Sequence, residues 1–172
     1  LMGIHSTTIP LTEFISEFGD VLIDSLNESN PPVYTGMTQA VHFQRQLVMN
    51  GLLRKPFDAQ AEVVQAVSAL LVDKNESAAV INAEMGTGKT MMAIAVAAVL
   101  HSEGYRRHLV VSPPHLVYKW RREILETVPN AKVWVLNGPD TLAKLIQPRA
   151  GRGILTSNDA PEFVILGRIR MR

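Results

Sequence analysis

Apolar residues recur every three or four positions along several stretches of this chain, which is the spacing of one face of a helix. The first stretch, residues 10–28, carries one apolar stripe with Gly19 as a weak point. A more polar stretch over residues 38–49 stops at Asn50 and Gly51. Further helices are predicted at residues 58–72, with Asp58 as the cap, and at residues 89–102, 113–128 and 141–146.

Short β-rich apolar runs lie between the later helices and predict buried strands. They occupy residues 78–82, 108–112, 132–136 and 162–166. Alternating strands and helices with short connections are typical of a parallel sheet with helices on both faces. The sequence therefore predicts an α/β fold. Ligands in such sheets bind beyond the carboxyl ends of the strands.

The chain divides by pattern into two parts. Residues 1–51 hold no chemical motif and form a predicted accessory helical segment, whereas residues 52–172 carry the alternating pattern. Apolar residues make up 47% of the 172 residues, and the net charge is only +1, so nucleic-acid contact would need a local basic patch. The absence of cysteine excludes disulfides and cysteine-based zinc sites. We expect a cytoplasmic protein without membrane contact.

One glycine-rich segment lies between a predicted strand and a predicted helix, and it reads "AEMGTGKT" from Ala83 to Thr90. Gly86 and Gly88 allow unusual backbone angles, so main-chain N–H groups can approach an anion closely. Lys89 would supply charge to the β- and γ-phosphates of ATP, and the Thr90 hydroxyl would bind Mg²⁺. The alternative is a glycine turn that binds nothing, with Lys89 solvated.

These residues resemble the first phosphate-binding motif of superfamily 2 helicases and translocases, in the form with alanine at the first position. The stretch "HLVVSPPHLVYKWRREI", residues 108–124, is similar to motif Ia of the Swi/Snf branch. The stretch "LLRKPFDAQ", residues 52–60, resembles the adenine-recognising Gln motif. The resemblance implies a first RecA-like lobe, incomplete in this chain, of a DNA-dependent ATPase.

Site roles follow from the resemblance. It implies that Gln60 reads the adenine edge, and that Phe57 either stacks on the base or packs in the core. Nucleotide contact and the catalytic lysine fall in the glycine loop, at Glu84, Met85, Gly86, Thr87, Gly88, Lys89 and Thr90. The resemblance also implies contact with nucleic acid, expected to be double-stranded DNA, at Ser112, Pro113 and His115. Trp120 shares a helical face with Leu116 and Ile124, which favours core packing.

An ATPase of this superfamily needs an Asp-Glu pair at the end of a later strand, and a second lobe that closes over the nucleotide. The chain has no Asp-Glu dipeptide. We therefore expect the N-terminal part of a longer translocase-like protein, which binds ATP and Mg²⁺ but does not hydrolyse ATP by itself. Two alternatives stay open: a small phosphate-loop kinase, and a non-catalytic nucleotide-binding module.

Overall fold

The computed structural model describes residues 9–136 and 160–167. It divides the chain into two compact units, Leu1–Thr35 and Gly36–Arg172, and each is treated by itself. The predicted helix at residues 141–146 and the acids Asp140 and Asp159 lie outside the described residues. The second unit begins at Gly36 and so includes part of the predicted accessory segment. The boundary at residue 51 between an accessory helical segment and the ATP-binding lobe stays a prediction.

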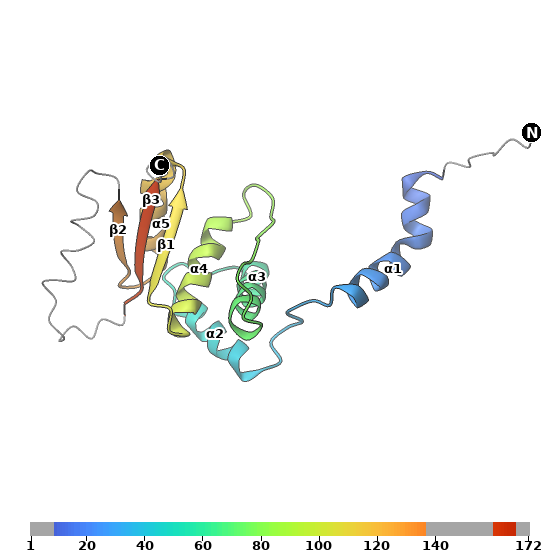
Figure 1. The fold of residues 1–172 in the computed structure, drawn as a ribbon, viewed down its shortest axis with the longest axis horizontal. Helices are drawn as coiled ribbons and strands as arrows, with labels where there is room; N and C mark the ends of the chain where they lie inside the picture. The colour runs from blue at the N-terminus through green and yellow to red at the C-terminus, as the bar shows by residue number, and fades with distance from the viewer. Residues whose placement is uncertain (1–8, 137–159, 168–172) are drawn as a thin grey trace, which may run out of the picture. The chain divides into compact units, whose positions relative to one another are not determined.

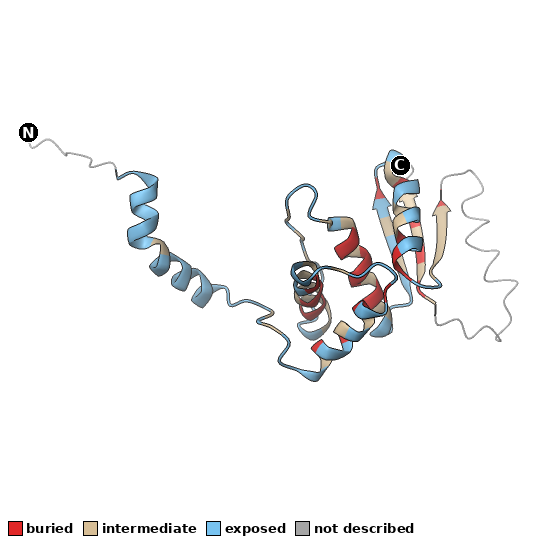
Figure 2. Ribbon diagram, turned by 180° about the vertical axis from the view of Figure 1, so that it is seen from behind, coloured by how far each residue is buried: buried red, intermediate tan, exposed pale blue. Residues whose placement is uncertain are grey.

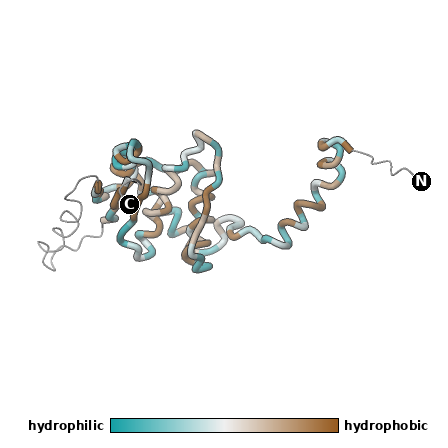
Figure 3. The backbone as a smooth tube through the Cα atoms, turned by 45° about the horizontal axis from the view of Figure 1, so that its top comes forward, coloured by the Kyte–Doolittle hydropathy of each residue, from teal (hydrophilic) through white to brown (hydrophobic). Residues whose placement is uncertain are grey.

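The first unit consists of one described helix, α1 (Leu11–Ser29), which runs through Gly19 without interruption. Hydrophobic and hydrophilic residues alternate along its tube (Figure 3). The predicted apolar stripe is present, and the rings of Phe14 and Phe18 lie 5.2 Å apart. None of the residues of α1 is buried, so this stripe has no core of its own.

The second unit begins with a layer of helices (Figure 1). These are α2 (Ala40–Asn50), α3 (Asp58–Ser68) with its continuation η1 (Ala69–Asp73), and α4 (Lys89–Ser102). The continuation η1 is a π-helix, in which the Lys74 N–H donates to the Ala69 oxygen over 2.9 Å. Half of the residues of α4 are buried (Figure 2), and the helix packs against both α2 and α3. Because α4 is apolar on most of its surface, it forms the centre of this layer.

The second layer is a parallel sheet of three strands in the order β1-β3-β2 within the described residues. The strands are β1 (Arg107–Ser112), β2 (Lys132–Leu136) and β3 (Glu162–Gly167). A 3₁₀ turn, η2 (Pro114–Leu116), and α5 (Val117–Thr127) connect β1 to β2. Parallel strands need such a crossover, so the predicted α/β class with a parallel sheet is confirmed.

The main core lies between this sheet and the helices. Phe163 and Ile165 of β3 are at most 1% exposed, and they belong to one cluster with buried residues of α4 and α5. Trp120 packs against this cluster as predicted. On the opposite face of the sheet, Leu109 and Val111 are 64% and 45% exposed.

The strand predicted at residues 78–82 is not formed. None of the three described strands pairs with this segment, and Val80 is 90% exposed. A β-strand is stable only when a neighbour takes up its main-chain hydrogen bonds. The prediction of a strand at residues 78–82 is therefore wrong, because the described part of the chain gives this apolar run no partner.

Candidate functional site

The glycine loop enters α4 through two residues in left-handed backbone conformations. Gly86 and Gly88 have φ angles of +88° and +86°, a region that residues with a Cβ avoid. Between them, Thr87 donates a hydrogen bond from its hydroxyl to the Glu84 oxygen over 2.8 Å. Gly88 is the N-cap residue of α4, so the first N–H groups of that helix face the loop. The backbone of this turn therefore needs glycine at both positions.

Lys89 bends back over this loop. Its ammonium group donates to the main-chain oxygens of Ala83, over 2.9 Å, and of Glu84, over 2.7 Å. Met85, at the tip of the loop, is 98% exposed. The loop thus holds a positive charge next to the helix N-terminus, where the helix dipole adds roughly half a positive charge. An anion at this point would meet an ammonium group and unpaired main-chain donors together.

Gln60 connects the start of α3 to the loop. Its side-chain nitrogen donates to the Thr87 oxygen over 2.9 Å, and its side-chain oxygen accepts the Phe57 N–H over 3.0 Å. The predicted cap at Asp58 is wrong, because α3 begins at Asp58 itself and Phe57 holds the cap position. Instead, the Gln60 side chain, three residues after Phe57, accepts a main-chain N–H at the start of the helix. Gln60 therefore organises both the helix start and the loop.

Phe57 lies on the surface with 78% of its area exposed, so core packing does not account for it. The alternative of core packing is therefore not borne out, and stacking of Phe57 on a base stays a prediction. Thr90 is the second residue of α4 and is partly buried. Within the described residues no group of three His, Asp or Glu side chains could hold a metal ion. Mg²⁺ bound through one hydroxyl and phosphate oxygens needs no such group. The loop residues thus fit a nucleotide with its magnesium ion.

The turn after β1 is the second predicted contact region. Ser112 is only 4% exposed, and its hydroxyl donates to the Pro113 oxygen over 3.3 Å. Pro113 and His115 are exposed at the start of η2. On α5, Lys119 and Arg122 pair with acids four residues along, over 3.7 Å and 3.9 Å. A nucleic-acid role for this turn stays a prediction, and it would fall mainly to the exposed residues.

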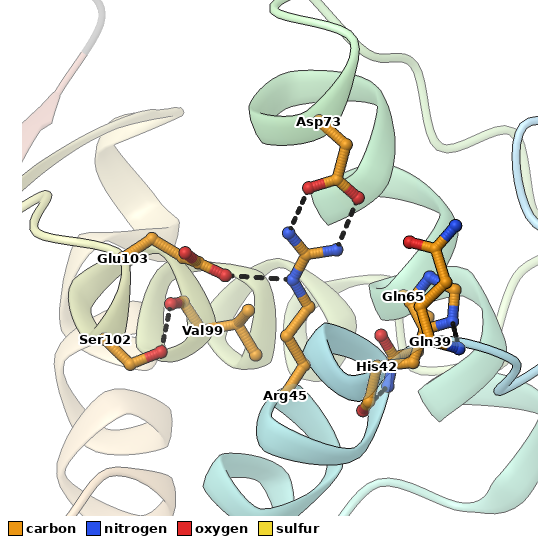
Figure 4. A network of polar contacts seen from close by, with 8 residues as sticks. All are labelled: Gln39, His42, Arg45, Gln65, Asp73, Val99, Ser102 and Glu103. Atoms are coloured by element: carbon orange, nitrogen blue, oxygen red, sulfur yellow. Dashed lines mark hydrogen bonds and ion pairs between the residues drawn. The ribbon is translucent and has the colours of Figure 1, made fainter.

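A buried arginine that the sequence analysis did not single out lies in α2. Arg45 is 1% exposed, and its guanidinium group binds both oxygens of Asp73, over 2.9 Å and 2.7 Å (Figure 4). It also donates to Glu103 over 3.0 Å. These bonds raise the pKa of Arg45, with Asp73 as the main cause, and the bond to Arg45 lowers the pKa of Asp73. Arg45 shares a buried face of α2 with His42 and Met49, a spacing that a search for apolar residues alone overlooks.

A cavity of about 670 Å³ lies elsewhere in the second unit. Its walls include Leu52, His101 and Lys132. His101 and Lys89 are near opposite ends of α4, about 18 Å apart at the rise of an α-helix. This cavity is therefore separate from the glycine loop.

Residues 54–158 match the family model described as type III restriction enzyme, res subunit (ResIII). The chain belongs to this family. The match includes the Gln60 region, the glycine loop and the turn after β1, so the ResIII chain carries a helicase-type ATPase domain.

Two curated proteins are also similar to part of this chain. One is the Bos taurus protein named SWI/SNF-related matrix-associated actin-dependent regulator of chromatin subfamily A containing DEAD/H box 1, 37% identical over 78 residues, or 45% of this chain. Another is the DNA excision repair protein CSB of Oryza sativa subsp. japonica, 39% identical over 59 residues, or 34% of this chain. The matched stretches cover only 8% and 5% of the lengths of these relatives. The resemblance to the Swi/Snf-like branch of superfamily 2 is confirmed.

Proposed function

We propose that this ResIII chain binds ATP with Mg²⁺ at the glycine loop, as the ATP-binding part of a DNA-dependent ATPase of the Swi/Snf-like type. The observation that carries the proposal is the position of Lys89. Its ammonium group is held over the loop by the oxygens of Ala83 and Glu84, next to the first N–H groups of α4. A phosphate group can replace those two weak acceptors with a charged one, which strengthens the contact.

The other site residues contact different parts of the nucleotide and its Mg²⁺ ion. The main chain of residues 86–88 lies against the phosphates, and the Thr90 hydroxyl is a ligand for Mg²⁺. Gln60 and Phe57 lie at the start of α3 and contact the adenine, through an amide and a ring face respectively. Glu84 and Met85 form the exposed rim of the loop. When bound, Mg²⁺ neutralises phosphate charge, and the remaining interactions belong to the chain's own residues.

The whole protein acts on DNA in this proposal. Support comes from the two relatives, one named as a regulator of chromatin and the other as a DNA excision repair protein. The exposed turn at Pro113 and His115, together with Ser112, contacts the DNA backbone, and double-stranded DNA is the expected partner. A second lobe closes over the nucleotide. None of the described helices has the length and apolar character needed to cross a membrane, and a cytoplasmic location stays a prediction.

Binding without hydrolysis is the expected property of the 172 residues themselves. They contain no Asp-Glu dipeptide, so they lack the pair that orders Mg²⁺ and the attacking water in this superfamily. The same absence favours a second candidate for this chain, a nucleotide-binding module without catalysis. A phosphate-loop kinase would need an acceptor site, for which the described residues offer no support.

Thermal unfolding with and without nucleotide tests the proposal. MgATP at about a hundred times its dissociation constant should stabilise the chain by about 2.7 kcal/mol, a rise in Tm of about 5–10 °C. Thr90→Val keeps the shape but loses the hydroxyl, so its rise with MgATP should fall to the rise seen with ATP and EDTA. Lys74→Ala, an exposed lysine outside the loop, should behave as wild type. A wild-type chain whose Tm does not change with MgATP would contradict the proposal.

A further inference from the structure

Two helices carry the proposed nucleotide site at one end and bind one arginine at the other. The α3–η1 helix begins at Asp58, beside Gln60, and ends at Asp73. The helix α4 begins at Lys89, and its C-terminal cap is Glu103. Both acids bind Arg45 (Figure 4). A single guanidinium group from α2 therefore joins the far ends of the two helices that bring Gln60 and the glycine loop together.

This three-residue cluster of Arg45, Asp73 and Glu103, here termed the Arg45 clamp, is geometrically restrictive. Arg45 is 1% exposed, whereas the side chains of Asp73 and Glu103 are 33% and 26% exposed. A planar guanidinium group that binds one carboxylate with two bonds fixes the direction of that carboxylate as well as its distance. The third bond then fixes the second carboxylate against the same plane. The clamp thus sets both the separation and the angle of the helix ends.

The angle between these helices decides whether Gln60 reaches the loop. Each helix is about 20 Å long at 1.5 Å per residue, so a change of about 5° at the clamped end moves the other end by roughly 2 Å. The contact at that end is the hydrogen bond from Gln60 to the Thr87 oxygen, at 2.9 Å. A hydrogen bond is lost well before such a displacement is reached.

We propose that Arg45 is a positioning residue for the nucleotide site: it holds Gln60 in register with the glycine loop and so determines how much the adenine adds to affinity. Arg45 lies before the region that matches the ResIII family model, in the part of the chain without a chemical motif. The inference rests on the proposed function, because it assumes that Gln60 and the loop bind one nucleotide.

The test compares two ligands on the full 172-residue chain, MgATP and magnesium tripolyphosphate, which has the phosphates but no base. Wild type should bind MgATP more tightly than tripolyphosphate. Arg45→Met keeps the side-chain length but loses the guanidinium group. The affinity of this variant for MgATP should fall about three- to tenfold, the range expected for one lost hydrogen bond. Its affinity for tripolyphosphate should fall much less, since Lys89 and the first N–H groups of α4 belong to one helix that the substitution leaves intact.

Two further variants separate positioning from loss of stability. Ile165→Val removes a methylene group from the core at β3, away from the clamp, and should leave both affinities unchanged when measured below the unfolding transition. Asp73→Asn keeps the shape of the carboxylate but not its charge, and should weaken MgATP binding selectively, as Arg45→Met does. If Arg45→Met does not fold, Arg45→Lys, which keeps the charge without the guanidinium group, takes its place in the comparison.

The outcomes are distinguishable. Equal losses for both ligands, or no loss for either, in the Arg45 and Asp73 variants would overturn the positioning role and leave the proposed function in place. Equal affinity of the wild type for MgATP and tripolyphosphate would also overturn it, because no adenine contribution would exist. A wild-type chain that binds neither ligand would overturn the proposed function itself.

Discussion

The side-chain nitrogen of Gln60 donates a hydrogen bond to the main-chain oxygen of Thr87, over 2.9 Å. These residues are 27 positions apart, and their contact ties the start of α3 to the glycine loop. The same contact sets a limit on the loop, since a Cβ atom at Gly88 would come within 2.5 Å of the Gln60 nitrogen. Gln60 and the glycine loop are therefore in contact without a ligand.

Replacing Gln60 with alanine should reduce the preference for ATP over GTP. The amide of Gln60 offers a donor and an acceptor that match the adenine edge but not the guanine edge. Competition binding should show a clear preference for ATP in wild type and a smaller one in Gln60→Ala, by about three- to tenfold for one lost hydrogen bond. A wild type that binds both nucleotides equally would show that Gln60 serves the loop alone.

Replacing Gly88 with alanine should weaken nucleotide binding more than it weakens the fold. The φ angle of +86° at this position makes any side chain unfavourable, by about 1–2 kcal/mol, and the new methyl group would displace Gln60 from Thr87. Gly36→Ala is the matched control, because Gly36 also has a positive φ angle, +117°, but has no atom within 4 Å of the Cβ position. Denaturant unfolding should show similar losses of stability for the two variants.

The two variants should differ in their affinity for MgATP, which calorimetry measures. Gly36→Ala should bind MgATP as wild type does, since Gly36 belongs neither to the glycine loop nor to the Arg45 clamp. Gly88→Ala should bind it measurably more weakly. Equal affinities for the two variants would mean that the approach of Gln60 to Gly88 does not influence the nucleotide.

Burial of His108 should make the chain less stable in mild acid. The centre of its ring lies 5.1 Å from that of Phe163, with the two ring planes tilted by 36°. Burial, with a smaller contribution from His101, lowers the pKa of His108 below its usual 6.5. The unfolded chain therefore binds this proton at a higher pH than the native one, so the free energy of unfolding falls as pH falls below about 6.5. The effect is at most about 1.4 kcal/mol for each pH unit. Urea unfolding at pH 7.5 and pH 5.5 should show this loss in wild type and a smaller loss in His108→Gln, and identical losses would contradict it.

The 172 residues should not hydrolyse ATP. Lys89, Thr90 and the loop supply binding, but hydrolysis also needs two carboxylates and an arginine from a second lobe, and the arginine alone is worth about 10³ to 10⁵ in rate. A phosphate-release assay, with and without double-stranded DNA, should show no turnover above that of Lys89→Ala. DNA-stimulated turnover that disappears in Lys89→Ala would show that other acids form a working site.

The sequence predicted what is encoded locally. The helix at residues 89–102 was predicted with its observed bounds, because glycines lie on both sides of an unbroken run of helix-forming residues. The glycine loop was found for the same reason, since its chemistry lies within eight consecutive residues. The bonds of Gln60 to Phe57 and Thr87 were not predicted, although the residue was identified.

Interactions between residues far apart in the sequence could not be predicted from local patterns. The strand expected at residues 78–82 needed a partner that no local pattern can supply, and Val80 is instead almost fully exposed. The bond from Arg45 to Glu103 joins residues 58 positions apart, and neither residue stands out in its own segment. A buried arginine in a helix is recognised only when the acids that neutralise it are placed around it.

The position of the Lys89 ammonium group over the loop is the centre of this account, and calorimetry of MgATP binding tests it most directly. Lys89→Ala keeps the main-chain donors but removes a charge-assisted contact worth about 1.5–3 kcal/mol, so affinity should fall roughly ten- to a hundredfold. Lys74→Ala, which removes an exposed lysine outside the loop, should bind as wild type does. Equal affinity for MgATP in wild type and Lys89→Ala would contradict the assignment of the glycine loop as the nucleotide site.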